Sequence, residues 1–257
     1  MDRIGHRDLL IVQTLGRVRV ANARQLQRAH FFSSTPLSNA RSSRATLARL
    51  ARWRVVARLD RRVGGVRSGS AGYVYSLDVV GRRLLEGMRP VGTGRFRRPW
   101  TPSATFLHHA LAVTELYVRL LEAERGGHLE VLTYDAEPDC WRTFTGPGGE
   151  AVVVKPDAYV RIGVGAFEEH AFVEVDRGTE SARALGIKLD RYRAYWASGR
   201  EQQGNDVFPR VVWLVPDAKR HDQLVDVASR QPAEAWRLFK VARFEDAVSA
   251  LAGGGNG

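Results

Sequence analysis

Three acidic side chains fall on two neighbouring segments that both have the alternating pattern of a β-strand. These segments are residues 151–162 and 167–176, and the short glycine-containing connection between them predicts an antiparallel hairpin. Pairing their apolar sides places Asp157, Glu174 and Asp176 together on the opposite face. Three carboxylates on one face repel one another unless a cation lies among them, so this face is a candidate site for chemistry.

Hard oxygen ligands of this kind suit Mg²⁺ or Mn²⁺, which makes the three carboxylates a candidate metal site. A metal held there could polarise a phosphodiester and lower the pKa of an attacking water. The alternative is a solvated polar face, whose charge is balanced by Lys155, Arg161 and Arg177. The spacing of the residues alone does not decide between these two interpretations.

A second candidate site lies near the N-terminus, in a helix predicted from about residue 38 to residue 53. Successive residues of an α-helix are rotated by about 100°, so small and apolar side chains form one stripe of this helix and four arginines lie on the opposite side. These are Arg41, Arg44, Arg49 and Arg52. The helix contains no acidic residue, whereas a solvated face normally mixes both signs. Such an arc suits a recognition helix in the major groove of duplex DNA, where arginine reaches guanine edges or phosphates.

Two shorter helices precede this arginine-rich helix. Residues 4–16 predict a first helix that ends at Gly16, a plausible C-cap glycine. Asn22 is the expected N-cap of a second helix over residues 23–30, with Leu26 on its inward side. We therefore expect three helices within the first 53 residues.

A basic hairpin follows the third helix. Strands are predicted at residues 55–59 and 73–77, and the glycine-rich segment between them is typical of a wing that lies along a phosphate backbone or a minor groove. Helices and hairpin in this order resemble a winged helix-turn-helix over residues 4–77. Arg54 stands where many such domains have glycine, which predicts a strained turn. The arginines of the wing are Arg61, Arg62 and Arg67.

Charge is distributed unevenly along the 257 residues. Residues 1–100 carry 21 arginines and five acidic side chains, a net charge of +16. Residues 101–257 carry 18 basic and 23 acidic side chains, a net charge of −5. The positive field therefore belongs to one end of the chain, as expected when that end neutralises phosphates and the other end has another task.

Several classes of protein are excluded by composition. Cys140 is the only cysteine, so an internal disulfide and a cysteine-rich zinc site are ruled out. No apolar run approaches the roughly 18 residues that span a bilayer. No glycine-rich phosphate loop follows a predicted strand, which argues against nucleotide binding. We expect a cytoplasmic protein without a membrane partner.

The same patterns divide the chain into two domains of an α+β protein. We expect a DNA-binding domain at residues 1–87 and a linker at residues 88–103 that is rich in proline, glycine and arginine. A second domain at residues 104–250 opens with a long helix from about residue 105 to residue 124. Strands and helices then alternate, as in an α/β sheet domain.

Pro156-Asp157, followed after sixteen residues by Glu174-Val175-Asp176, resembles the PD-(D/E)XK motif of restriction-endonuclease-like nucleases. The resemblance implies that Asp157 and Glu174 bind the metal and that a lysine positions the attacking water. Asp176 stands where that lysine is expected. Some members of this fold take the lysine from the following helix, and Lys188 borders the apolar stripe of the helix predicted there.

Most of the chain, roughly residues 4–215, resembles the replication-relaxation family of actinobacterial plasmids and integrative elements. The resemblance implies a DNA-binding protein of mobile-element replication, maintenance or transfer. It is carried by the N-terminal helices and hairpin, His108-His109-Ala-Leu-Ala-Val, Pro156-Asp157-Ala158, the segment from Glu174 to Glu180, and the segment from Lys188 to Tyr195.

Two functions are consistent with these features. In the first, the chain is a non-catalytic factor that binds double-stranded DNA, and its second domain serves for homodimerisation or partner contact. In the second, it is a Mg²⁺- or Mn²⁺-dependent endonuclease, in which Asp157, Glu174 and Asp176 bind the metal while Lys188 or Lys155 orients water. The missing lysine favours the first function, and the two retained carboxylate segments favour the second. We favour the first.

Overall fold

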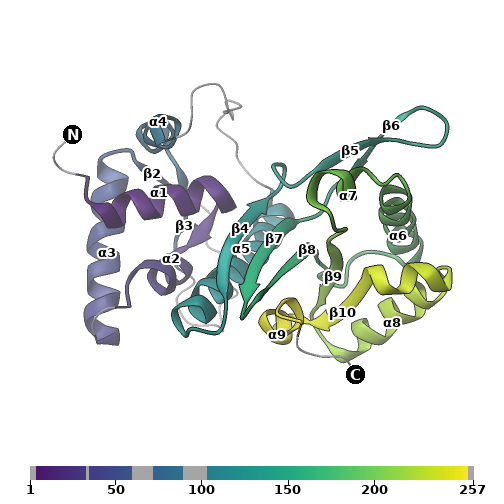
Figure 1. The fold of residues 1–257 in the computed structure, drawn as a ribbon. Coiled ribbons are helices and arrows are strands. Elements are labelled where there is room, and N and C mark those ends of the chain that lie inside the picture. Colours follow the sequence, from purple (N-terminus) through teal and green to yellow (C-terminus); the bar gives the residue numbers. More distant parts are fainter. Residues whose placement is uncertain (1–3, 33–34, 60–71, 89–102, 254–257) are drawn as a thin grey trace. The chain divides into compact units, whose positions relative to one another are not determined.

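A computed structural model describes the chain over residues 4–32, 35–59, 72–88 and 103–253 (Figure 1). It divides into two compact units, residues 1–122 and 123–257. Both contain helices and strands, so the α+β class expected from the sequence is confirmed. Over the described ranges, no helix is long and apolar enough to cross a membrane.

The first unit begins with three helices, as expected from the sequence. They are α1 (His6–Val18), α2 (Ala23–His30) and α3 (Pro36–Arg52). Asn22 caps α2 as predicted, because its side chain accepts a hydrogen bond from the backbone N–H of Gln25. The Gln25 side chain accepts one from the Asn22 N–H in return. Apolar side chains from all three helices form one core with the residues that follow α3.

Two helix ends differ from the prediction. Helix α1 continues past Gly16, where a Cβ atom would lie 2.4 Å from Cδ2 of Leu85. That glycine therefore permits close packing of a neighbouring helix and does not end α1. Helix α3 begins earlier than expected, because Thr35 accepts a hydrogen bond from the Ser38 N–H and Pro36 occupies the first turn.

A three-stranded antiparallel sheet completes this part of the unit. It contains β1 (Ala21–Asn22), β2 (Val56–Leu59) and β3 (Val74–Leu77), in the order β1-β3-β2. The hairpin predicted after α3 is present as β2 and β3. The segment between them lies outside the described residues, and Arg61, Arg62 and Arg67 lie there with it.

Two backbone positions shape the passage from α3 into β2. Arg54 has a positive φ of 56°, a backbone conformation that favours glycine. This explains why many similar domains have glycine here, and it confirms the predicted strained turn. Helix α4 (Val79–Met88) then passes so close that a Cβ on Gly81 would lie 2.1 Å from the carbonyl oxygen of Val55. Only glycine fits there without moving backbone.

The long helix α5 (Ala104–Arg125) crosses the boundary between the units, and most of it belongs to the first. Thr114 Oγ1 donates to the carbonyl oxygen of Val20 at 2.7 Å. Gln25 Nε2 donates to the carbonyl oxygen of Leu111 at 2.9 Å. The division therefore falls within α5, whereas the sequence placed it at residues 88–103 and assigned this helix to the second domain.

The second unit is built on a five-stranded mixed sheet in the order β10-β9-β8-β7-β4. Strands β4, β7 and β8 are antiparallel neighbours, whereas β8, β9 and β10 run parallel. The hairpin predicted from the alternating pattern is confirmed as β7 and β8. The strands are β4 (Glu130–Ala136), β7 (Ala158–Val164), β8 (Phe167–Val175), β9 (Arg210–Val215) and β10 (Phe239–Arg243).

The first strand predicted for that hairpin is divided in two. Residues 151–154 form β6 (Ala151–Val154), which pairs with β5 (Arg142–Thr145) as a separate two-stranded ribbon. The chain joins the main sheet only at β7, after Pro156, which has no N–H to donate to a strand ladder. Figure 1 shows the turn of this β5–β6 ribbon projecting from the second unit.

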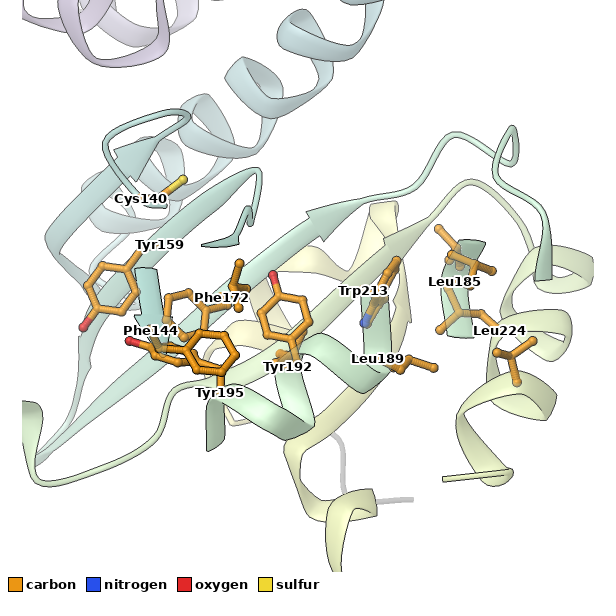
Figure 2. Packing of buried hydrophobic residues seen from close by; sticks show 14 residues of the cluster. Cys140, Phe144, Tyr159, Phe172, Leu185, Leu189, Tyr192, Tyr195, Trp213 and Leu224 are labelled. Carbon is orange, nitrogen blue, oxygen red and sulfur yellow. The ribbon is translucent and has the colours of Figure 1, made fainter. Parts of the chain in front are cut away.

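Helices and one large apolar cluster complete the second unit. Phe172 of β8, Trp213 of β9, and Tyr192 and Tyr195 of α6 pack in this cluster (Figure 2). Phe144 of the ribbon packs against Tyr195, with ring centroids 5.2 Å apart. The helical segments are α6 (Ala182–Ala197), α7 (Arg200–Asn205), α8 (Ala218–Ser229), η1 (Ala233–Leu238), η2 (Phe244–Asp246) and α9 (Ala247–Leu251).

Candidate functional site

Three of the four arginines predicted to contact DNA lie on the exposed side of α3. Arg41, Arg44 and Arg52 are exposed, while Leu47 and Leu50 are buried on the opposite side. The Arg44 Nε donates to the carbonyl oxygen one turn earlier, at 3.2 Å. Among the described residues, none of these three guanidinium groups takes part in an ion pair, which leaves their charge available to an external anion.

Arg49 has a different role from the other three arginines. Its Nη2 lies 2.6 Å and 2.8 Å from the two carboxylate oxygens of Asp8 in α1. Its guanidinium also lies 5.0 Å from the ring centroid of Trp53. The Asp8 side chain is only 3% exposed, so this ion pair fastens α3 to α1. The acid in the first turn of α1 was the sequence signal for this pair.

Arg58 and Tyr73 form a contact that the sequence analysis did not single out. The Arg58 guanidinium lies over the Tyr73 ring, 3.3 Å from its centroid. Both residues are exposed, and they flank the segment between β2 and β3 that is not described. The pair therefore places one more cation at the base of the predicted wing. Its signal in the sequence was an arginine and a tyrosine at facing ends of two predicted strands.

The carboxylate site of the second unit centres on Glu174, in the buried strand β8. Glu174 is only 2% exposed. Its two oxygens accept hydrogen bonds from Lys188 Nζ at 3.0 Å and from the Tyr192 hydroxyl at 2.7 Å. Lys188 and Tyr192 are four residues apart on α6, so both reach the sheet from one side of that helix. Lys188 Nζ also lies 2.8 Å from Glu180 Oε1.

Asp157 lies beside this group, in the break between β6 and β7. Its Oδ2 accepts a hydrogen bond from the Val175 N–H at 2.7 Å, which holds the carboxylate at the end of β8. It is close enough to Glu174 to affect the titration of that side chain. The structure therefore brings together Asp157, Glu174 and Lys188, the lysine predicted on the following helix.

Burial dominates the electrostatics of this cluster. Burial and then the Asp157 carboxylate raise the pKa of Glu174 to about 8, although Lys188 and Tyr192 act in the opposite direction. Burial alone would lower the pKa of Lys188, but the carboxylates of Glu174 and Glu180 outweigh it and raise the pKa overall. Lys188 stays positively charged and keeps the Glu180 carboxylate as its ion-pair partner while Glu174 holds its proton.

Asp176 does not join this cluster. Strand β8 ends at Val175, and the next side chain pairs with Arg220 of α8, whose Nε donates to Asp176 Oδ2. Asp176 Oδ1 accepts a hydrogen bond from the Gly178 N–H at 2.7 Å. Arg220 also donates to the carbonyl oxygen of Glu180 at 2.8 Å. The alternation that predicted three carboxylates on one face stops where the strand stops.

The remaining geometry allows a smaller metal site than the sequence suggested. Nowhere in the described ranges do three His, Cys, Asp or Glu side chains gather in a way that could hold a metal ion. Asp157 and Glu174 converge as a pair of hard oxygen donors, and Oε2 of Glu180 is buried without a hydrogen-bond partner. Glu180, Tyr192 and Arg220 were not among the expected site residues, because nothing in the local pattern links them to Glu174.

Comparison with known proteins gives one match. A family model described as "Replication-relaxation" matches residues 12–211, a span that contains α3, Asp157, Glu174 and Lys188. No curated protein and no solved structure matches the chain.

Proposed function

The chain belongs to the replication-relaxation family, and from this premise we propose that it is a DNA-binding protein of plasmid or mobile-element replication or maintenance. The observation that carries the proposal is the exposed face of α3. Three guanidinium groups lie there outside any ion pair of the described residues, on a helix without an acidic side chain. Guanidinium groups in this arrangement suit the phosphates and guanine edges of duplex DNA.

The order of elements in the first unit supports a winged helix-turn-helix for this task. The order α1, β1, α2, α3, β2, β3 is that of a helical core followed by a hairpin, and α3 takes the position of a recognition helix. Arg58 on Tyr73 adds a cation at the base of the hairpin. In this proposal α3 enters the major groove, and the hairpin lies along the neighbouring backbone or minor groove.

Duplex binding by the full chain tests the proposal directly. We expect the triple variant Arg41→Ala, Arg44→Ala, Arg52→Ala to lose most of its affinity for a labelled duplex and to show a shallower salt dependence, by about one unit of slope per lost phosphate contact. The matched control replaces three exposed arginines of the second unit, Arg191, Arg210 and Arg237. Equal affinity of the two triple variants would refute the role of α3.

A Mg²⁺-dependent endonuclease is the second candidate function, and the contacts of Lys188 favour it. Lys188 Nζ lies 3.0 Å from Glu174, beside Asp157, where a nuclease of the PD-(D/E)XK type needs its lysine. The donor set fits a magnesium ion, which proteins often hold through one or two carboxylates together with water and substrate phosphate. Asp157 and Glu174 would hold that ion, which would polarise the scissile phosphate when bound.

The side chains of the chain would supply the rest of this second function. Lys188 would place its positive charge beside the phosphate and orient water through its ammonium protons. Tyr192 would keep the Glu174 carboxyl in place through its hydroxyl. Asp176 would hold α8 and the segment before α6 through Arg220, at a distance from the reacting groups.

Nicking of supercoiled plasmid in the presence of Mn²⁺ tests the second candidate. We expect the wild-type protein to nick, and Asp157→Ala and Lys188→Ala to reduce nicking to background while still shifting linear duplex. The matched controls are Asp222→Ala and Lys219→Ala, which change exposed residues of α8. A wild-type protein that binds duplex DNA but leaves the plasmid intact would eliminate the endonuclease.

A further inference from the structure

The β5–β6 ribbon has two unlike faces. Phe144 and Val154 point to the apolar cluster of the second unit, and Arg142 lies over the rings of Tyr159 and Phe172 on the same side. The other face, which we call the open face, is formed by the alternate residues of both strands together with Trp141, which precedes β5, and Lys155, which follows β6. The strand residues are Thr143, Thr145, Ala151 and Val153, and all six are exposed or half-buried.

An aromatic ring and a cation are paired at one end of the open face. Lys155 Nζ lies 4.6 Å from the ring centroid of Trp141, and the indole remains 37% exposed. The open face carries no acidic side chain, although the chain beyond residue 100 is acidic overall. An exposed indole beside an ammonium group offers a planar surface for stacking and a positive charge for a phosphate in the same place.

The backbone beside the pair is held by contacts of the neighbouring Cys140. Cys140, which precedes the indole, is fully buried, and its thiol donates to the carbonyl oxygen of Pro156 at 3.0 Å. Burial raises the pKa of this thiol, which therefore stays protonated as a donor. Arg142 donates to the carbonyl oxygen of Cys140 at 2.9 Å. Because Asp157 follows Pro156 directly, these contacts hold the backbone that precedes Trp141 against the segment that leads into Asp157.

We propose that the open face of the β5–β6 ribbon binds an unpaired DNA strand, with a base stacked on Trp141 and a phosphate beside Lys155. Stacking favours an unpaired strand because a base within a duplex already has its faces covered by its neighbours. The remaining residues of the face are small or β-branched and carry no charge that would repel a phosphate backbone. The acidic residues nearest in the chain, Asp139 and Glu150, lie outside this set of residues.

This surface is distinct from the duplex-binding face of α3, and the inference does not depend on that face. It adds to the proposed function a second kind of DNA in a second unit. A protein of replication or relaxation could hold an opened strand there while the duplex is bound elsewhere. No step of a reaction is needed for this binding.

Fluorescence anisotropy of the full chain with a labelled thymidine oligonucleotide and a labelled hairpin duplex tests the inference. We expect Trp141→Ala to weaken binding of the oligonucleotide about tenfold, since stacking on one aromatic side chain has an effect of this order. Duplex binding should change less than twofold. Trp141→Phe should retain most of the affinity, because it keeps a ring for stacking.

The matched control is Trp236→Ala, which removes a more exposed indole from η1, at 53% exposure, with no cation over its ring among the described residues. Thr143→Glu adds a negative charge to the open face without touching the apolar cluster, and we expect it to weaken oligonucleotide binding severalfold. Equal oligonucleotide affinity of the Trp141→Ala and Trp236→Ala variants would overturn the inference. So would a parallel loss of duplex and oligonucleotide binding in Trp141→Ala.

Failure of this inference is distinguishable from failure of the proposed function. Replacing Arg41, Arg44 and Arg52 should reduce duplex binding and leave the loss caused by Trp141→Ala unchanged. If the arginine variant keeps its duplex affinity while Trp141→Ala still loses the oligonucleotide, only the proposal for α3 falls.

Discussion

The two candidate sites hold their charges in opposite ways. On α3, three arginines extend from the first unit, and none is ion-paired with a described residue. In the second unit, Lys188 contacts the Glu174 and Glu180 side chains, and at the end of β8 Asp176 contacts Arg220. An exposed charge remains solvated without a partner, whereas a buried charge is stable only when it is paired.

The two regions therefore differ in how available their charged side chains are to a ligand. Both regions are rich in ionisable side chains, but only the α3 arginines can meet an external anion without breaking an internal contact. A ligand at Glu174 must displace Lys188 or Tyr192 from one of its oxygens, or be held mainly by Asp157. A ligand can therefore bind the exposed arginines of α3 without a change in the fold, whereas a ligand at Glu174 requires existing contacts to rearrange.

Breaking the buried ion pair should have the largest effect. We expect Arg220→Ala to lower the free energy of unfolding by about 3–5 kcal/mol, because it leaves the Asp176 carboxylate buried without its cation. Urea denaturation of the full chain measures this. The matched control is Arg230→Ala, whose pair with Asp226 is exposed and should contribute less than about 1 kcal/mol. Similar losses in the two variants would contradict the contrast.

The pH dependence of stability should come next. Folding raises the pKa of Glu174 to about 8, so the folded state keeps a proton that the unfolded chain has released. The stabilisation is complete below the unfolded pKa of about 4.5 and is lost as the pH rises towards 8. We expect the urea concentration at the unfolding midpoint to decrease as the pH rises from 5 to 8.5, and to decrease more steeply for the wild type than for Glu174→Gln. Parallel profiles would show that Glu174 titrates normally.

A strained position in the first unit should give a smaller change of opposite sign. Arg54 has a positive φ, and its ion pair with Asp78 is exposed. We expect Arg54→Gly to raise the free energy of unfolding by about 1 kcal/mol, because glycine relieves the backbone strain. Arg54→Ala keeps the strain and removes only the ion pair, so it should not stabilise. If both variants have a higher free energy of unfolding than the wild type, the effect comes from the loss of the arginine side chain and not from the backbone.

The exposed arginines should affect stability least. We expect the variant Arg41→Ala, Arg44→Ala, Arg52→Ala to unfold within about 0.5 kcal/mol of the wild type, because none of these side chains is buried or ion-paired in the described residues. Thermal denaturation followed by circular dichroism measures this. A large loss would mean that the arginines support the fold, and the loss of duplex binding would then need another explanation.

Local patterns predicted the parts of the fold that local chemistry determines. Asn22 caps α2, and β7 and β8 form the expected hairpin. The long helix predicted from about residue 105 to residue 124 is α5. Each of these rests on side-chain periodicity or on a hydrogen bond within a few residues, which a single sequence reveals directly.

Long-range contacts explain what the patterns missed. Asp176 pairs with a residue 44 positions later, and Arg49 pairs with one 41 positions earlier. Gly16 resembles a helix end in the sequence because the residue it packs against, Leu85, lies on a helix far along the chain. Lys188 lies on the helix after β8, where the resemblance to nucleases places a candidate lysine, and its Nζ lies 3.0 Å from Glu174.

Helix α5 has a consequence for how the two units can be inherited. Arg28 of α2 contacts Glu115 and Glu122 of this helix, and Thr114 is fully buried against the first unit. Near its other end, Glu124 accepts a hydrogen bond from the Val131 N–H at the start of β4. A recombination event within residues 89–102 would therefore separate the first unit from the helix that covers it. A viable exchange of modules between genes must carry α5 up to Glu122 with the first unit and place its crossover after that residue.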